Sequence, residues 1–130
     1  MQRLLTRYIC VGVGGAAGSL LRYMLGSLIN NRYSGRFPLA TFTINVTGSF
    51  LIGLLLTILT ERAHVNPNWR PLVIVGFLGG YTTFSAFEWE TYTAIGEGFS
   101  IIALLYVILS VIVGYAGCWA GAMVARWSNS

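Results

Sequence analysis

The sequence is poor in charge, and this scarcity excludes most kinds of soluble protein. It has no lysine and no aspartate; its charged side chains are eight arginines and four glutamates, only 9% of 130 residues. A soluble domain is about 25% charged, whereas 55% of this chain is hydrophobic and its mean hydropathy is +0.70. We therefore expect most residues to lie in a lipid bilayer, where a net charge of +4 concerns topology and is no sign of nucleic-acid binding.

Cysteine is also scarce. Cys10 and Cys118 are the only two, and each lies inside a long apolar stretch. They form neither a CxxC pair nor a disulfide framework, so we interpret both as small packing residues. The single histidine, His64, stands beside Glu61 and Arg62 and is interpreted as a solvated loop residue. Because the sequence contains no nucleophile–base pair and no group of metal-ligating side chains, an enzyme is not predicted.

Long apolar runs are what the sequence has in abundance. A helix needs about 20 apolar residues to cross the hydrocarbon core. Four such spans are predicted, at residues 4–29, 39–60, 71–95 and 101–126. They leave no room for a linker, so a single four-helix transmembrane domain over residues 1–130 is expected. Although Arg3 and Arg7 precede the first run as in a signal peptide, the run is too long and Arg22 interrupts it, which favours a retained helix.

The arginines give only a weak indication of orientation. With the N-terminus inside, the cytoplasmic arginines would be Arg3, Arg7, Arg62, Arg70 and Arg126. Arg32 and Arg36 would then lie outside, with Arg22 near that side. The positive-inside rule therefore leans toward a cytoplasmic N-terminus without fixing it.

The third span contains residues that are unfavourable for a continuous helix, in the run Gly79-Gly80-Tyr81-Thr82-Thr83. Glycine has the largest backbone entropy cost in a helix, and threonine is only a modest helix former. A break within lipid is tolerated where the freed backbone groups are buried in protein or line a polar cavity. We therefore predict an ion or substrate site at this break.

Several side chains after the break are candidates for that site. Phe84 and Phe87 are three residues apart, and Glu88 follows Phe84 by four, so all three can share one side of a helix. A ring edge is electropositive and favours an anion, and the hydroxyls of Thr83 and Ser85 can donate to it. The alternatives are core packing for the two rings and an interfacial position for Glu88.

Polar residues in the other spans extend this hypothesis. Asn45 either makes an interhelical hydrogen bond or presents an amide N–H to an anion. Ser110 either lines a pathway or bonds its own helix. The GxxxG spacings that begin at Gly14 and Gly117 fit packing within one subunit or between subunits. Since four helices can scarcely enclose a polar pathway, a two-fold dimer is expected.

The segment GGYTTFSAFEWE, residues 79–90, closely resembles the GGxTTFSTF signature of the Fluc (CrcB) fluoride channels, with Ala86 in place of a threonine. The runs GGAAGSLLRY (14–23) and TFTINVTGSFLIG (41–53) resemble that family's first and second helices. The resemblance implies an antiparallel, dual-topology homodimer in the bacterial inner membrane. Such a dimer exports fluoride passively through two pores and lowers cytoplasmic fluoride, with fluoride, a second copy and lipid as its partners.

The resemblance also assigns roles to individual residues. It implies that Phe84 and Phe87 line the pore together with Asn45, and that the backbone carbonyls of Gly79 and Thr82 hold a structural sodium ion at the dimer centre. Ser110 matches the family's polar position in the fourth helix. Ser85, Thr83 and Glu88 complete the predicted fluoride pathway.

Two further classes of function compete with a channel. A proton-coupled exporter would use Glu88, as small four-helix multidrug transporters use a glutamate, but theirs lies in the first helix, where this chain has none. An assembly subunit would use the same motifs for packing alone. Fluoride flux measured with and without a pH gradient separates these hypotheses.

Overall fold

The computed structural model describes residues 1–61 and 65–128. Within these ranges every regular element is helical, which confirms the all-α prediction. The elements are α1 (Gln2–Arg32), α2 (Leu39–Glu61), the π-helix η1 (Arg70–Leu78), α3 (Gly79–Tyr81), α4 (Ser85–Gly96) and α5 (Ser100–Trp127). Arg62 and His64, to which the sequence assigned a topological and a solvated-loop role, lie outside the described residues.

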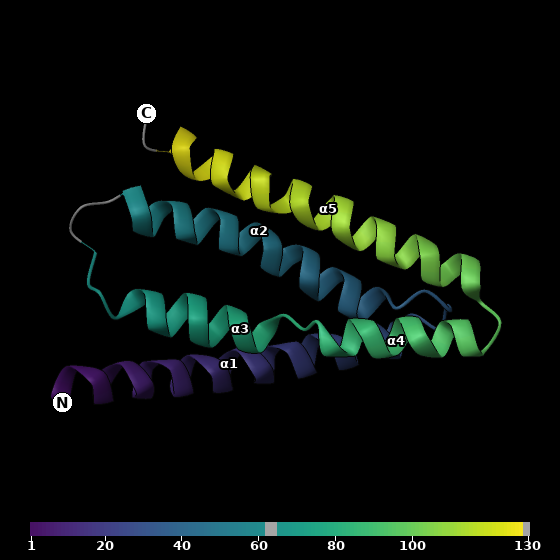
Figure 1. Ribbon diagram of the computed structural model, residues 1–130, viewed down its shortest axis with the longest axis horizontal. Helices are drawn as coiled ribbons and strands as arrows, with labels where there is room; N and C mark the ends of the chain where they lie inside the picture. The colour runs from purple at the N-terminus through teal and green to yellow at the C-terminus, as the bar shows by residue number, and fades with distance from the viewer. Residues whose placement is uncertain (62–64, 129–130) are drawn as a thin grey trace.

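Among the described residues, four segments are long and apolar enough to cross a membrane: Gln2–Arg32, Leu39–Glu61, Arg70–Gly96 and Ser100–Trp127. The largest difference from the sequence prediction is at the end of the first span, which reaches Arg32 instead of residue 29. Figure 1 shows these segments side by side, running alternately in opposite directions, with both termini at one end. Four crossings were therefore predicted correctly from apolar run length alone.

The tightest helix contacts are made through glycine. A Cβ atom added at Gly14 or Gly18 of α1 would overlap the carbonyl oxygens of Leu72 and Phe77, respectively, in η1. In the other direction, a Cβ at Gly76 would lie 2.7 Å from the Val11 carbonyl oxygen of α1. Backbone therefore contacts backbone along this pair, and the gain is close van der Waals packing where lipid supplies no hydrophobic force between helices.

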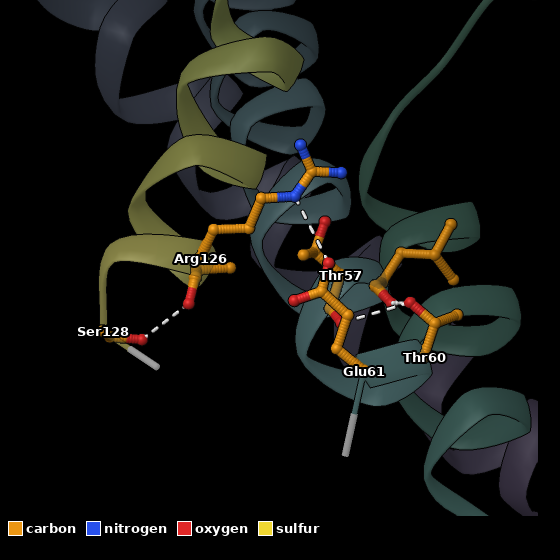
Figure 2. Close-up of polar contacts among 7 residues, drawn as sticks. Thr57, Thr60, Glu61, Arg126 and Ser128 are labelled. Atoms are coloured by element: carbon orange, nitrogen blue, oxygen red, sulfur yellow. Dashed lines mark hydrogen bonds and ion pairs between the residues drawn. The ribbon is translucent and has the colours of Figure 1, made fainter. Parts of the chain in front are cut away.

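A second glycine contact joins α2 and α5. A Cβ at Gly53 would overlap the carbonyl oxygen of Cys118, and one at Gly121 would overlap that of Phe50. Both GxxxG spacings noted in the sequence thus pack within one subunit. At the end that carries the termini, the same two helices are joined by an exposed ion pair from Arg126 Nε to Glu61 Oε1 at 3.3 Å, as Figure 2 shows.

At the opposite end, a glycine-terminated turn connects α4 to α5. Gly98 has φ of +87°, a conformation that favours glycine. Its N–H donates to the Ile95 carbonyl at 3.0 Å, and the Phe99 N–H donates to the Ala94 carbonyl at 2.8 Å. This pattern is a Schellman motif, and it fixes the position of Phe99.

Candidate functional site

The third span is interrupted after the glycine pair. Gly79 has helical angles (φ −63°, ψ −35°), and α3 ends at Tyr81. Thr82 is extended (φ −81°, ψ 161°), and α4 begins at Ser85. Figure 1 shows the non-helical link between α3 and α4. The interruption therefore lies at residues 82–84, whereas Gly79 and Gly80 stay helical.

The Asn45 side chain of α2 holds this interruption in place. Its Nδ2 donates to the Thr83 carbonyl at 2.8 Å, and its Oδ1 accepts from the Thr83 N–H at 2.9 Å. A neighbouring contact adds to this anchor, because the Thr47 and Tyr81 hydroxyls are hydrogen-bonded at 2.8 Å. An amide nitrogen carries two hydrogens, so one N–H of Asn45 remains after the bond to Thr83.

The interruption removes the usual helical partners of several carbonyl groups, among them those of Gly79 and Thr82. In a continuous helix the Thr83 N–H would bond the Gly79 carbonyl, but it donates to Asn45 instead. Likewise the Ala86 N–H, which would bond the Thr82 carbonyl, donates to Thr83 Oγ1 at 3.3 Å. The family resemblance implies that the Gly79 and Thr82 carbonyls hold a cation. Within lipid, unsatisfied backbone groups cost several kcal/mol each.

A cavity of about 430 Å³ lies beside the interruption. Seven of the predicted site residues line it: Asn45, Gly79, Thr82, Thr83, Phe84, Phe87 and Ser110. None of its lining residues is charged. The positive end of the α4 dipole begins beside Phe84 and Thr83. The cavity thus offers dipoles and hydrogen-bond donors without a fixed charge.

Ser85 and Glu88 do not line this cavity in the described structure. Both are exposed, although Phe84 and Glu88 are separated by one helical turn. The i+4 rule places two side chains on the same face, but it also places them about 5–6 Å apart along the axis. The lining of the cavity includes Phe87 and does not include Glu88, one residue further along α4. Their place in the pathway stays a prediction.

The two phenylalanines differ sharply in exposure. Phe87 is 8% exposed and packs against Tyr106, with ring centroids 5.0 Å apart. Phe84 is 73% exposed, and its ring centroid lies 5.9 Å from that of Phe87 at an interplanar angle of 37°. One ring therefore belongs to the packed interior, whereas the other is available to a partner surface or a ligand.

Ser110 of α5 supplies an unused hydroxyl. Its Oγ is buried and has no hydrogen-bond partner among the described residues. Ser49 Oγ, by contrast, donates to the Asn45 carbonyl of its own helix at 2.8 Å. Since buried hydroxyls are nearly always hydrogen-bonded, the Ser110 O–H is a candidate donor to whatever occupies the cavity.

The sequence reasoning missed a hydrogen-bonded cluster, formed by Glu90, Thr41 and Tyr106, at the edge of this site. Glu90 Oε1 accepts from Thr41 Oγ1 and its Oε2 accepts from the Tyr106 hydroxyl, both at 2.7 Å. The cluster joins α2, α4 and α5, and Tyr106 links it to Phe87. The signal available in the sequence was a glutamate inside an apolar span, together with hydroxyl-bearing residues in the second and fourth spans.

The sequence also matches the family model described as "CrcB-like protein, Camphor Resistance (CrcB)" over residues 9–122. The chain belongs to the CrcB family. A CrcB relative from Solibacter usitatus is 53% identical over 120 residues, covering 92% of this chain and 98% of that protein. Relatives from Acidobacterium capsulatum and Coxiella burnetii are 47% and 40% identical, covering 92% and 91% of this chain and 96% of each relative. Each is named "Fluoride-specific ion channel FluC".

CrcB membership agrees with the family resemblance seen in the three sequence motifs. Together with the four membrane-capable helices, it identifies the chain as a multi-pass membrane protein. The matched region contains every predicted site residue, from Asn45 in α2 to Ser110 in α5.

Proposed function

We propose that this protein is a fluoride-selective ion channel that exports fluoride passively across the bacterial inner membrane and so lowers cytoplasmic fluoride. The observation that carries the proposal is the uncharged cavity at the interrupted third span, with Asn45, Ser110 and two phenylalanine rings at its wall. The relatives named as fluoride-specific channels support the choice of ion. The proposal is for a channel and not an enzyme.

Replacement of water is the central chemical task of such a pore. Fluoride is small and strongly hydrated, so a selective pathway offers donors in place of its hydration shell and stays too narrow for larger anions. The remaining N–H of Asn45 and the unpartnered O–H of Ser110 are suitable donors. The electropositive ring edges of Phe84 and Phe87 supplement them, and so does the N-terminal end of α4.

A second copy of the chain completes this proposal. The cavity opens at the protein surface, and Phe84, at its wall, is 73% exposed. If the open side of the cavity faced lipid directly, the Thr82 and Gly79 carbonyls would lie in hydrocarbon, which is unfavourable. An antiparallel homodimer would cover the opening and form two pathways. The weak arginine bias is compatible with chains that insert in both orientations.

The freed carbonyls fit a small hard cation. Backbone oxygens suit such ions, and Gly79 and Thr82 each present one without its helical partner. Two carbonyls from each copy would give four oxygens at the dimer centre. A sodium ion there would offset the partial negative charges of these oxygens. The chain's own contribution is to hold these oxygens in place through the Asn45–Thr83 contact.

We expect prolonged removal of sodium, with a large organic cation in its place, to weaken the dimer and to stop fluoride flux. An ion present at about a hundred times its dissociation constant stabilises its folded partner by about 2.7 kcal/mol, so its loss should lower dimer stability by a similar amount. Dimer dissociation and flux are measured on the same preparation, and re-addition of sodium serves as the control. Unchanged dimerisation and flux in the sodium-free medium would contradict the cation site.

The function itself is tested by fluoride efflux from liposomes that contain the purified protein. We expect efflux that follows the fluoride gradient and the imposed voltage, does not depend on a pH gradient, and excludes chloride. Efflux that requires a proton gradient would support the exporter that uses Glu88. No fluoride flux from a folded dimer would leave an assembly role. Empty liposomes provide the baseline.

A further inference from the structure

A second cavity, of about 260 Å³, lies where the α1–α2 connection meets the turn between α4 and α5. It is lined by the aromatic residues Trp89 and Phe99 and by three charged residues: Arg36, Glu90 and Glu97. These connections are at the end of the bundle that carries neither terminus (Figure 1). This cavity therefore lies toward a membrane surface, whereas the uncharged one lies at mid-span.

Glu90 links the two cavities. It lines the outer cavity, and its Oε2 accepts a hydrogen bond from Tyr106. Tyr106 in turn packs against Phe87, with ring centroids 5.0 Å apart, and Phe87 lines the uncharged cavity. The charged groups of the outer cavity are therefore one hydrogen bond and one ring contact away from the inner cavity.

Without Arg36, the charged side chains that line the outer cavity would all be glutamates. The two glutamates carry negative charge, and Arg36 is the one basic residue that lines the outer cavity. Its guanidinium lies over the Phe99 ring, 4.1 Å from the centroid, which is the geometry of a cation–π contact. The Schellman motif at Gly98 fixes Phe99, so the turn between α4 and α5 determines where the positive charge stands.

We propose that Arg36 offsets the negative charge of Glu90 and Glu97 at the outer cavity and thereby sets the rate at which fluoride enters the pathway. The inference rests on the proposed channel function and adds a residue that determines its rate. A cavity lined by low-dielectric walls focuses the field of its charges and raises or lowers the local concentration of an ion. Arg36 acts through that field and is not required to bind fluoride directly.

The test compares fluoride flux through Arg36→Gln with wild type at low and high ionic strength, with sodium constant and fluoride well below saturation. The Debye length is about 30 Å at 0.01 M and about 3 Å at 1 M. We expect the flux of Arg36→Gln to fall about threefold at low ionic strength and to return to wild-type flux at high ionic strength. Arg36→Lys should keep most of the flux, because it preserves the charge.

Two further variants keep the test decisive. Arg32→Gln removes the same charge four residues away, from an exposed side chain that does not line the cavity, and should change flux less than Arg36→Gln. Glu97→Gln should raise flux at low ionic strength, and it remains informative if Arg36→Gln fails to fold. Equal losses at both ionic strengths, or no effect of either Arg36→Gln or Glu97→Gln, would overturn this inference alone. Absence of wild-type flux would overturn the proposed function as well.

Discussion

Fluoride flux should fall by about a hundredfold or more when Asn45 is replaced by aspartate. The substitution removes the Nδ2–H that donates to the Thr83 carbonyl at 2.8 Å and places a carboxylate oxygen against that carbonyl. It also brings a negative charge to an otherwise uncharged cavity. Two like charges about 5 Å apart at an effective dielectric constant of about 20 repel by about 3 kcal/mol, which corresponds to about a hundredfold in rate.

The measurement is fluoride efflux from liposomes containing equal amounts of folded dimer. Asn66→Asp is a matched control, because Asn66 is an exposed loop residue whose Oδ1 only accepts, from the Asn68 N–H at 2.9 Å; aspartate preserves that bond. Asn45→Ala removes both contacts with Thr83 without adding charge and should reduce flux less than Asn45→Asp. Normal flux through a correctly folded Asn45→Asp dimer would restrict Asn45 to packing.

A large loss of stability is expected from an added methyl group at Gly18. In Gly18→Ala the Cβ atom would overlap the Phe77 carbonyl oxygen and lie 2.9 Å from the Tyr81 nitrogen. Both are backbone atoms, which cannot move aside by changing a rotamer, so α1 must shift away from η1 and α3. Overpacking of this kind costs about 3 kcal/mol, and for a chain of this size that corresponds to a lower melting temperature by about 10 °C.

Gly12→Ala is the matched control for this prediction. Gly12 is in the same helix, and an added Cβ there meets nothing within 4 Å. Alanine is a better helix former than glycine by about 1 kcal/mol, so Gly12→Ala should be neutral or slightly stabilising. Thermal unfolding of both variants in detergent provides the comparison. Equal melting temperatures for Gly18→Ala and wild type would show that α1 does not pack closely against the third span.

Apolar run length was enough to predict the four crossings, because the bilayer imposes a minimum length on each helix. It was not enough to locate the interruption to the residue. Glycine propensity pointed to Gly79 and Gly80, yet both are helical. A Cβ at Gly80 would lie 2.5 Å from the Gly15 carbonyl oxygen, so this glycine permits close packing. The extended residue is Thr82, and the Asn45 contact with the next residue, from another helix, accompanies that geometry.

The candidate site was predictable to the extent that its residues follow one another in sequence. Phe84 and Phe87 follow the interruption directly, and Asn45 and Ser110 are polar residues in apolar spans, so each carried a local signal. Glu90 is also a polar residue in an apolar span, but its partners Thr41 and Tyr106 belong to other helices, so their hydrogen bonds could not be predicted from spacing. Spacing along one helix likewise gives the face of Glu88 and not its depth relative to the cavity. Such properties depend on how helices dock.

The paired hydrogen bonds between Asn45 and Thr83 have a mechanical consequence. A single bond would leave the extended link free to pivot about it, but two antiparallel bonds, at 2.8 and 2.9 Å, resist both rotation and sliding. These bonds tie the backbone of Thr83 to α2. A passage that rejects larger ions by its width needs walls that do not dilate when a larger ion pushes on them. In this chain the Asn45 amide supplies that stiffness together with the neighbouring Thr47–Tyr81 hydrogen bond, so loss of the amide should appear as leakage of larger anions before any loss of fold.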